Sequence, residues 1–264
     1  MKSNLVVLKL GGSVITEKAK PLTPNLLAIE RLADEIFQAK PSRLILVHGG
    51  GSFGHPIAKK YGIAEGFKDK SQLAGFSKTH EAMVSLNKII VESLLNRELP
   101  AFGMAPSSFI VTKTGRIHIF EEEPLKQALK VGLIPVLYGD AVLDVDKGFA
   151  ILSGDQLAPF IAERMKAQRL VMGVDVDGLY TDDPKKNPSA HMIPHLTLAE
   201  LKNPKNRITG TGVTDVTGGM LGKVSEMVSP VAKGIETLIV NASKPGIVYK
   251  VLIGEEVVGT KIEP

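Results

Sequence analysis

An apolar run that ends in a cluster of glycines is the sequence feature that most constrains the fold of this chain. Residues 44–47 (Leu-Ile-Leu-Val) are followed directly by residues 48–55 (His-Gly-Gly-Gly-Ser-Phe-Gly-His). Four consecutive apolar residues are typical of a strand that is covered on both faces. The glycines allow a sharp turn and a close approach to a ligand, because no Cβ stands in the way. The stretch therefore predicts a buried strand that leads into a phosphate-binding loop.

The same pattern occurs at the start of the chain. Residues 5–10 form an apolar run that contains Lys9 and continues into Gly11-Gly12-Ser13. Between the two runs, apolar residues recur at helical spacing up to Ile36, after the helix-start signal Thr23-Pro24-Asn25. This order predicts a β-α-β unit with a glycine loop after each strand.

Strands and helices alternate along the rest of the chain, which predicts a mainly parallel sheet with helices on both faces. Ligands of such sheets bind beyond the carboxyl ends of the strands. We expect a division into two lobes near residues 165–170. The expected elements are a helix that begins near His55, a helix over 71–96 whose apolar face includes Leu73, a hairpin at Thr114-Gly115, helices over 124–131 and 220–233, and strands over 133–137, 170–174 and 238–240.

Composition excludes several classes of function. The 264 residues contain no cysteine, so disulfides, thiolate metal sites and cysteine nucleophiles are absent, which fits a reducing cytoplasm. The start of the chain does not resemble a signal peptide, and no apolar run is long enough for a membrane span. The net charge is only +4, the charges are interspersed and aromatics make up 5%, so a nucleic-acid surface is not expected.

The glycine spacing matches two well-known nucleotide motifs only superficially. Gly49, Gly51 and Gly54 satisfy G-x-G-x-x-G, but they follow the second strand and lead into a helix, and no acidic residue ends a strand about 20 residues later, since Asp69 lies in a polar loop. Gly222-Lys223 is followed by Val224 and lacks the earlier glycine of a Walker A loop. We therefore interpret the glycines as a phosphate site built from several loops, including the one before Met220.

Three lysines lie next to these loops, at Lys9, Lys18 and Lys223. Phosphoryl transfer depends mainly on positioning and charge neutralisation, so such lysines are the expected catalytic groups. Most lysines are simply solvated, but Lys9 ends a buried strand and needs a partner there.

Four carboxylates are candidates for the same site. Asp155 either orients two of the lysines, holds Mg²⁺ through water or caps a helix, whereas Asp140, Asp175 and Asp177 are either ligands or turn formers. Among the histidines, His48 ends a strand and His55 lies beyond the glycines, so His55 is the candidate for the site.

Six motifs together resemble the amino-acid kinase superfamily and span nearly the whole chain. They are Lys9–Thr16 with Lys18, His48–His55, Tyr138–Asp140, Ser153–Asp155, Asp175–Gly178, and Asp215–Met220 with Lys223. The resemblance implies an open αβα sandwich in which residues 1–166 hold the phosphate acceptor and residues 167–264 hold ATP. The segment Ser52–His55 is similar to the branch of the superfamily that phosphorylates isopentenyl phosphate. Gln156 stands where some relatives carry a second acidic residue.

Site roles follow from that resemblance. Lys9, Lys18, Lys223, Asp155 and His55 are the expected catalytic residues, with Mg²⁺ carried by ATP and no direct protein ligand. The acceptor phosphate is expected at Gly50, Gly51, Gly54, His55 and Gly154. The nucleotide is expected at Lys9, Gly11, Gly12, Ser13, Asp175, Tyr180, Asp183, Pro184, Lys185, Gly219 and Lys223.

The acceptor itself is predicted from charge and apolarity. A phosphate monoester is largely dianionic at neutral pH, with a second pKa of about 6, and it attacks ATP without a general base. The sequence offers no compelling base. The candidates for a pocket that binds an apolar tail are Phe76, Thr79, His80, Met83, Leu86 and Ile151. Each of them could instead be an ordinary core residue. Three alternatives stay open: a kinase of a phosphonate such as fosfomycin, a more distant small-molecule kinase of the same superfamily, and a non-catalytic nucleotide or oxyanion storage protein. A homodimer is expected.

Overall fold

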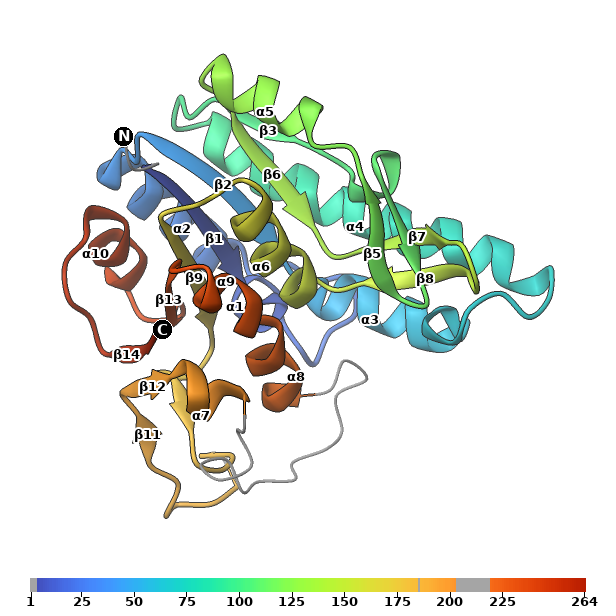
Figure 1. Ribbon diagram of the computed structural model, residues 1–264. Helices are drawn as coiled ribbons and strands as arrows, with labels where there is room; N and C mark the ends of the chain where they lie inside the picture. The colour runs from blue at the N-terminus through green and yellow to red at the C-terminus, as the bar shows by residue number, and fades with distance from the viewer. Residues whose placement is uncertain (1–3, 185, 203–218) are drawn as a thin grey trace.

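A large twisted sheet forms the centre of the computed structural model, which describes residues 4–184, 186–202 and 219–264 (Figure 1). In these residues the sheet has eight strands in the order β12-β14-β13-β9-β1-β2-β6-β3, and all neighbours are parallel except β13 and β14. The strands are β1 (Leu5–Leu10), β2 (Arg43–His48), β3 (Ala101–Gly103), β6 (Ile134–Tyr138), β9 (Arg169–Val174), β12 (His195–Thr197), β13 (Glu236–Asn241) and β14 (Gly259–Glu263).

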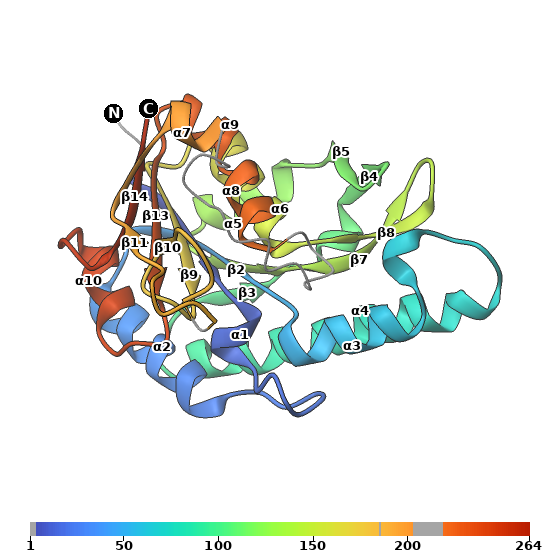
Figure 2. The same cartoon turned by 90° about the horizontal axis from the view of Figure 1, so that it is seen from below.

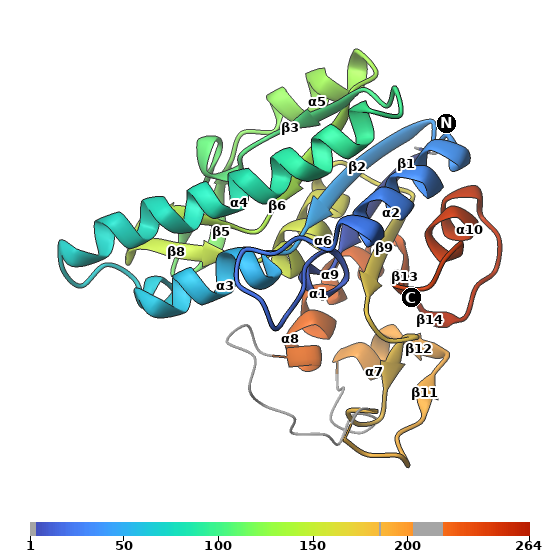
Figure 3. The same cartoon turned by 180° about the vertical axis from the view of Figure 1, so that it is seen from behind.

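Helices cover both faces of this sheet, as the view from below shows (Figure 2). One apolar core lies under α5 (Glu123–Lys130), α6 (Gly154–Arg164), α7 (Leu198–Lys202), α8 (Gly219–Glu226) and α9 (Val228–Ala232). The second core lies under α1 (Gly12–Ile15), α2 (Leu26–Ala39), α3 (Gly51–Lys60), α4 (Ser71–Leu95) and α10 (Ile247–Ile253). Figure 3 shows these helices from behind. The predicted αβα sandwich with a mainly parallel sheet is confirmed.

Two smaller sheets lie outside the main one. Strands β4 (Ile110–Lys113), β5 (Arg116–Phe120), β7 (Asp140–Asp144) and β8 (Gly148–Leu152) form a sheet in the order β5-β4-β7-β8. The buried Asp144 carboxylate joins its two turns, because it accepts N–H bonds from Gly115 (2.7 Å) and Lys147 (2.8 Å). Strands β10 (Leu179–Tyr180) and β11 (Met192–Ile193) form the second small sheet. The hairpin at Thr114-Gly115 is confirmed, but the sequence did not predict a separate sheet.

Most of the predicted helix boundaries are confirmed. Asn25 caps α2 by accepting a bond from the Ala28 N–H, and Ser153 caps α6 by accepting one from the Gln156 N–H. Helix α4 covers nearly the whole range predicted for it. Leu73, however, is half exposed, so its place on the apolar face was wrong.

Two helix predictions were also wrong. Helix α3 begins at Gly51, so His55 lies in its second turn and not at its start. Pro56 is accommodated inside α3 because the Ser52 carbonyl, which has no helical donor there, accepts from the Leu22 N–H (3.0 Å). The single helix expected over 220–233 is two helices, α8 and α9, because Pro230 lacks an N–H and its ring excludes a helical path past the Glu226 carbonyl.

Candidate active site

Three glycine loops meet at the carboxyl ends of the central strands. The loop after β1 touches the loop after β2 so closely that a Cβ at Gly12 would lie 2.3 Å from the Gly51 nitrogen. The start of α6 packs against the same place, since a Cβ at Gly154 would lie 3.1 Å from the His48 carbonyl oxygen. Glycine is therefore required here for backbone packing between the loops as well as for turning.

Gly51 is the most constrained of these positions. Its φ of +47° is in the left-handed region, and a Cβ would lie 2.1 Å from Thr16 Oγ1. The Thr16 hydroxyl donates to the Gly12 carbonyl (2.7 Å) and accepts from the Ser52 N–H (3.0 Å). This hydroxyl joins the two loops directly.

Several amides at this junction are left for a ligand. The first-turn N–H groups of α1, α3 and α6 have no helical acceptor. In the parts of the chain that the structure describes, no protein acceptor is bound to the N–H of Gly12, Gly50, Gly51 or Gly154. Gly11 differs, since its N–H donates to the Gly173 carbonyl (2.8 Å). Converging helix amides of this kind bind phosphate groups.

A carboxylate at the start of α6 binds two of the predicted lysines. Asp155 Oδ1 lies 2.8 Å from Lys9 Nζ, and its Oδ2 lies 3.0 Å from Lys223 Nζ. Lys9 comes from β1 and is buried, whereas Lys223 comes from α8. The expectation that Lys9 has a partner is confirmed. Asp155 binds two lysines, in agreement with one of the three interpretations given for it.

The two lysines keep the Asp155 carboxylate ionised. Burial by itself raises the pKa of Asp155, but the charges and hydrogen bonds of Lys9 and Lys223 outweigh it and lower the pKa from 3.8 to about 2. Asp155 is therefore ionised at neutral pH. The cluster carries two cations and one anion, and its net positive charge lies beside the unpaired amides.

The other predicted lysine lies further out. Lys18 Nζ is 3.2 Å from Asp175 Oδ2, and the Lys18 side chain is mostly exposed. Asp175 follows β9, which is the neighbour of β1, so this pair lies on the side of the site toward β13. Lys18 is not part of the Asp155 cluster, but it is placed at the same edge of the sheet.

Asp177 is held by the loop that follows β13. Its Oδ1 lies 2.9 Å from the Asn241 side-chain nitrogen and 2.6 Å from Lys244 Nζ. The Lys244 and Asn241 hydrogen bonds lower the pKa of Asp177, so it stays ionised. Asp177 therefore links the loop after β9 to the loop after β13.

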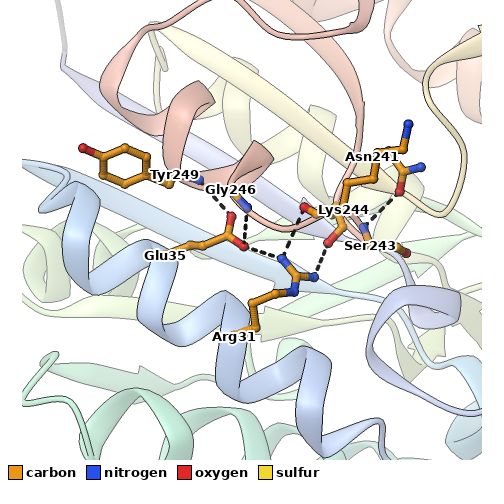
Figure 4. A network of polar contacts seen from close by, with 8 residues as sticks. Arg31, Glu35, Asn241, Ser243, Lys244, Gly246 and Tyr249 are labelled. Carbon is orange, nitrogen blue, oxygen red and sulfur yellow. Dashed lines mark hydrogen bonds and ion pairs between the residues drawn. The ribbon is translucent and has the colours of Figure 1, made fainter.

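Helix α2 holds the Asn241–Lys244 loop from below (Figure 4). Arg31 donates to the Ala242 carbonyl (2.6 Å), and the buried Glu35 carboxylate accepts from the Gly246 and Tyr249 N–H groups at 3.0 Å each. Arg31 and Glu35 also pair with each other. No sequence signal identified this network, because its members are separated by more than two hundred residues.

The histidines have different environments. His48 is buried, stacks on Tyr138 and bonds to Asn87 (3.2 Å), and burial lowers its pKa from 6.5 to about 4. It is a structural residue. His55 is exposed on α3, beside the glycines. His80, predicted as a pocket residue, forms an ion pair with Asp140 at 3.0 Å.

The other candidates for the acceptor pocket divide into two groups. Phe76 and Ile151 are partly buried and pack against the small apolar cluster around Phe149. Thr79, Met83 and Leu86 are buried in α4, and a Cβ at Gly54 would lie 2.8 Å from the Met83 sulfur. Met83 therefore forms the base of the glycine loop, and Leu86 belongs to the main core.

The remaining nucleotide candidates lie around the end of β9. Ser13 is in α1, Tyr180 ends β10, and Asp183 and Pro184 follow it in the loop before β11. Gly219 begins α8. Lys185 and the segment Asp215–Gly218 lie outside the described residues.

Gln156 has a specific structural role. Its side-chain oxygen accepts from the Ile117 N–H and its side-chain nitrogen donates to the Gly115 carbonyl, both at 3.1 Å. Arg116, which lies between Gly115 and Ile117 in the sequence, forms a bidentate ion pair with Glu226 of α8. The β4–β5 turn is thus fastened to the helices that carry Asp155 and Lys223.

The chain offers no protein-built metal site within residues 4–184, 186–202 and 219–264. No group of three histidine or carboxylate side chains there is arranged to hold a metal ion. Both oxygens of Asp155 are occupied by lysines. Of the helices described, none has the length and apolar character that a membrane span requires.

Comparison with known proteins agrees with this geometry. A family model described as "Amino acid kinase family" matches residues 4–241, and the chain belongs to that family. Within it, the chain is 41% identical to an isopentenyl phosphate kinase of Methanothermobacter thermautotrophicus and 37% identical to one of Methanocaldococcus jannaschii, each match covering 98% of both chains. A solved structure titled "X-ray structures of isopentenyl phosphate kinase" superposes with a TM-score of 0.86 at 38% identity, covering 98% of this chain and 99% of that one.

Proposed function

We propose that this chain transfers the γ-phosphoryl group of ATP to isopentenyl phosphate, which gives isopentenyl diphosphate and ADP. Full-length similarity to isopentenyl phosphate kinases supports the acceptor. The observation that carries the chemistry is the Lys9–Asp155–Lys223 cluster beside three sets of unpaired helix amides. It supplies positive charge and hydrogen-bond donors where a phosphoryl group passes between two oxygens.

The transfer itself needs positioning more than covalent chemistry. Lys9 and Lys223 are held in place by Asp155 before the substrates bind, so little reorganisation accompanies the reaction. The acceptor phosphate is already a dianion at neutral pH and needs no general base. Direct in-line transfer from ATP to the acceptor oxygen, without a covalent enzyme intermediate, follows from this arrangement.

We assign the acceptor to residues 1–166. The Gly50, Gly51 and Gly154 amides bind its phosphate, Gly54 lets α3 approach α4, and His55 adds a charge-assisted hydrogen bond. The small apolar cluster that includes Phe76 and Ile151 receives the isoprenoid tail.

We assign the nucleotide to residues 167–264, together with the loop after β1. The Gly12 and Ser13 amides reach its phosphates, and Lys18 with Asp175 lies on the same side. Mg²⁺ would enter this site with the nucleotide, because it is usually bound through substrate phosphates. When bound, it neutralises phosphate charge.

We also propose a cytoplasmic homodimer. A chain without cysteine suits a reducing compartment. Some exposed apolar side chains on neighbouring elements are suited to contact with a second copy: Leu95 at the end of α4, Phe102 on β3 and Val131 after α5. Light scattering would report twice the 28.3 kDa chain mass.

Product analysis by ³¹P NMR tests the proposal. With ATP, Mg²⁺ and isopentenyl phosphate, two coupled resonances of a new diphosphate should appear as the monophosphate signal disappears. Nucleotide binding without ADP release, for any of a panel of phosphate acceptors, would instead support the storage protein. Turnover with fosfomycin alone would support the phosphonate kinase.

A further inference from the structure

His80 lies between the two parts of the proposed acceptor site. It shares one face of α4 with Phe76, four residues earlier, and Met83, three residues later. The Met83 sulfur would lie 2.8 Å from a Cβ at Gly54 and 3.1 Å from one at Gly50. The Phe76 ring centre is 5.3 Å from that of Phe149 in the apolar cluster. His80 is therefore next to the glycines on one side and next to the apolar cluster on the other.

A fully buried carboxylate holds the His80 ring. Nδ1 lies 3.0 Å from Asp140 Oδ1 and 3.1 Å from Oδ2, and the Asp140 side chain has no exposed area. Asp140 also accepts from the Ala141 N–H (2.8 Å). A buried carboxylate needs a cation or several donors. The hydrogen bond to Asp140 raises the pKa of His80, in spite of burial, which favours the imidazolium form.

The ring geometry rules out a serine-histidine-aspartate relay. Ser107 Oγ is 3.4 Å from Nδ1, the same nitrogen that faces Asp140, whereas a relay needs the two partners on different ring nitrogens. Nε2 lies on the other edge of the ring, and no described protein atom accepts from it. The His80 side chain is 34% exposed, so the ring is accessible to a ligand.

We propose that His80 is a second phosphate-binding histidine of the acceptor site, donating from Nε2 to a phosphate oxygen at the junction between head group and tail. Asp140 acts as the positioning residue, because it orients the ring and compensates its charge from the buried side. The ligand class is a phosphate monoester with an apolar substituent. This inference rests on the proposed function for the identity of that substituent.

Calorimetric binding of two partial ligands separates a phosphate contact from a tail contact. Methyl phosphate carries only the head group, and isopentenyl alcohol carries only the tail. In His80→Leu, the dissociation constant for methyl phosphate should rise at least about tenfold while that for isopentenyl alcohol stays within about twofold. In His80→Gln, which retains a neutral donor, the dissociation constant for methyl phosphate should rise less than in His80→Leu. The matched control His195→Gln, on the edge strand β12, should change neither.

Kinetics provide the readout that a merely structural role would not give. The KM for isopentenyl phosphate should rise in His80→Leu with the KM for ATP unchanged, and Asp140→Asn should show a smaller effect of the same kind. Equal weakening of both partial ligands, unchanged methyl phosphate binding, or equal increases in both KM values would each overturn the proposal. Binding of methyl phosphate requires no turnover, so a wild-type protein that fails to phosphorylate isopentenyl phosphate would refute the proposed function without deciding the role of His80.

Discussion

Lys9 Nζ lies 2.8 Å from Asp155 Oδ1, and this buried ion pair joins the end of β1 to the first turn of α6. Because Asp155 also binds Lys223 of α8, one carboxylate sets the position of two cations from distant parts of the chain.

Asp155→Asn should lower the free energy of unfolding by about 3 kcal/mol at pH 7, because a buried lysine loses its countercharge. The folded-state pKa of Asp155, about 2, is below its ordinary value of 3.8. Its contribution to stability is therefore complete above about pH 4 and is lost as the pH falls through about 2. Urea titrations measure the free energy of unfolding of wild type and variant. The difference between the two should become smaller by about 2 kcal/mol as the pH falls from about 4 to about 2.

The exposed carboxylate Glu255, after α10, provides the control for that series. Glu255→Gln should change the free energy of unfolding by no more than about 0.5 kcal/mol. If the loss of unfolding free energy in Asp155→Asn is the same at about pH 5 and at about pH 2, the charge of Asp155 does not stabilise the fold.

Lys9→Met and Lys223→Met should each reduce kcat at least about a hundredfold with a smaller change in the KM for ATP. Their charges are most valuable when the phosphoryl group lies between the two oxygens, so the loss appears in the transition state. Steady-state kinetics with Lys250→Met as the control, an exposed lysine on α10, measures this. A raised KM with an intact kcat would assign these lysines to ground-state binding only.

Gly51→Ala should lower the free energy of unfolding by about 3 kcal/mol or more, because the new methyl group meets Thr16 Oγ1 and the backbone is left-handed. Gly132 is a matched control with a φ of +89° and open space around it. Gly132→Ala should cost only about 1 kcal/mol. If both variants lose a similar amount of unfolding free energy, the loop around Gly51 can move to accommodate the new methyl group.

His55→Ala should raise the KM for isopentenyl phosphate and lower kcat/KM by about 1–3 kcal/mol of transition-state stabilisation, with the KM for ATP unchanged. Because His55 is exposed, the substitution should leave the free energy of unfolding nearly unchanged. Acceptor kinetics identical to those of wild type would remove His55 from the site.

Local signals in the sequence predicted much of the fold. Buried runs, helix-start signals and glycine loops act over a few residues, so the strand 5–10, the helix start near Asn25 and the helix 71–96 were placed correctly. The burial of Lys9 at a strand end also predicted that it has a partner, which is Asp155. The role of each site residue toward substrate stays a prediction.

Contacts between distant elements were not predictable in the same way. The His80–Asp140 pair joins α4 to the start of β7, and Glu35 reaches the start of α10. Neither pair leaves a local pattern, because each depends on how helices pack on the sheet. The helix break before Pro230 was predictable, because a proline in the sequence disfavours a continuous helix.

The central claim is that the acceptor is isopentenyl phosphate, and the ratio of kcat/KM values for isopentenyl phosphate and fosfomycin tests it most directly. The proposed apolar pocket and the glycine loop should favour isopentenyl phosphate by more than about a hundredfold at neutral pH with saturating ATP and Mg²⁺. A ratio that favours fosfomycin by the same factor would contradict the account.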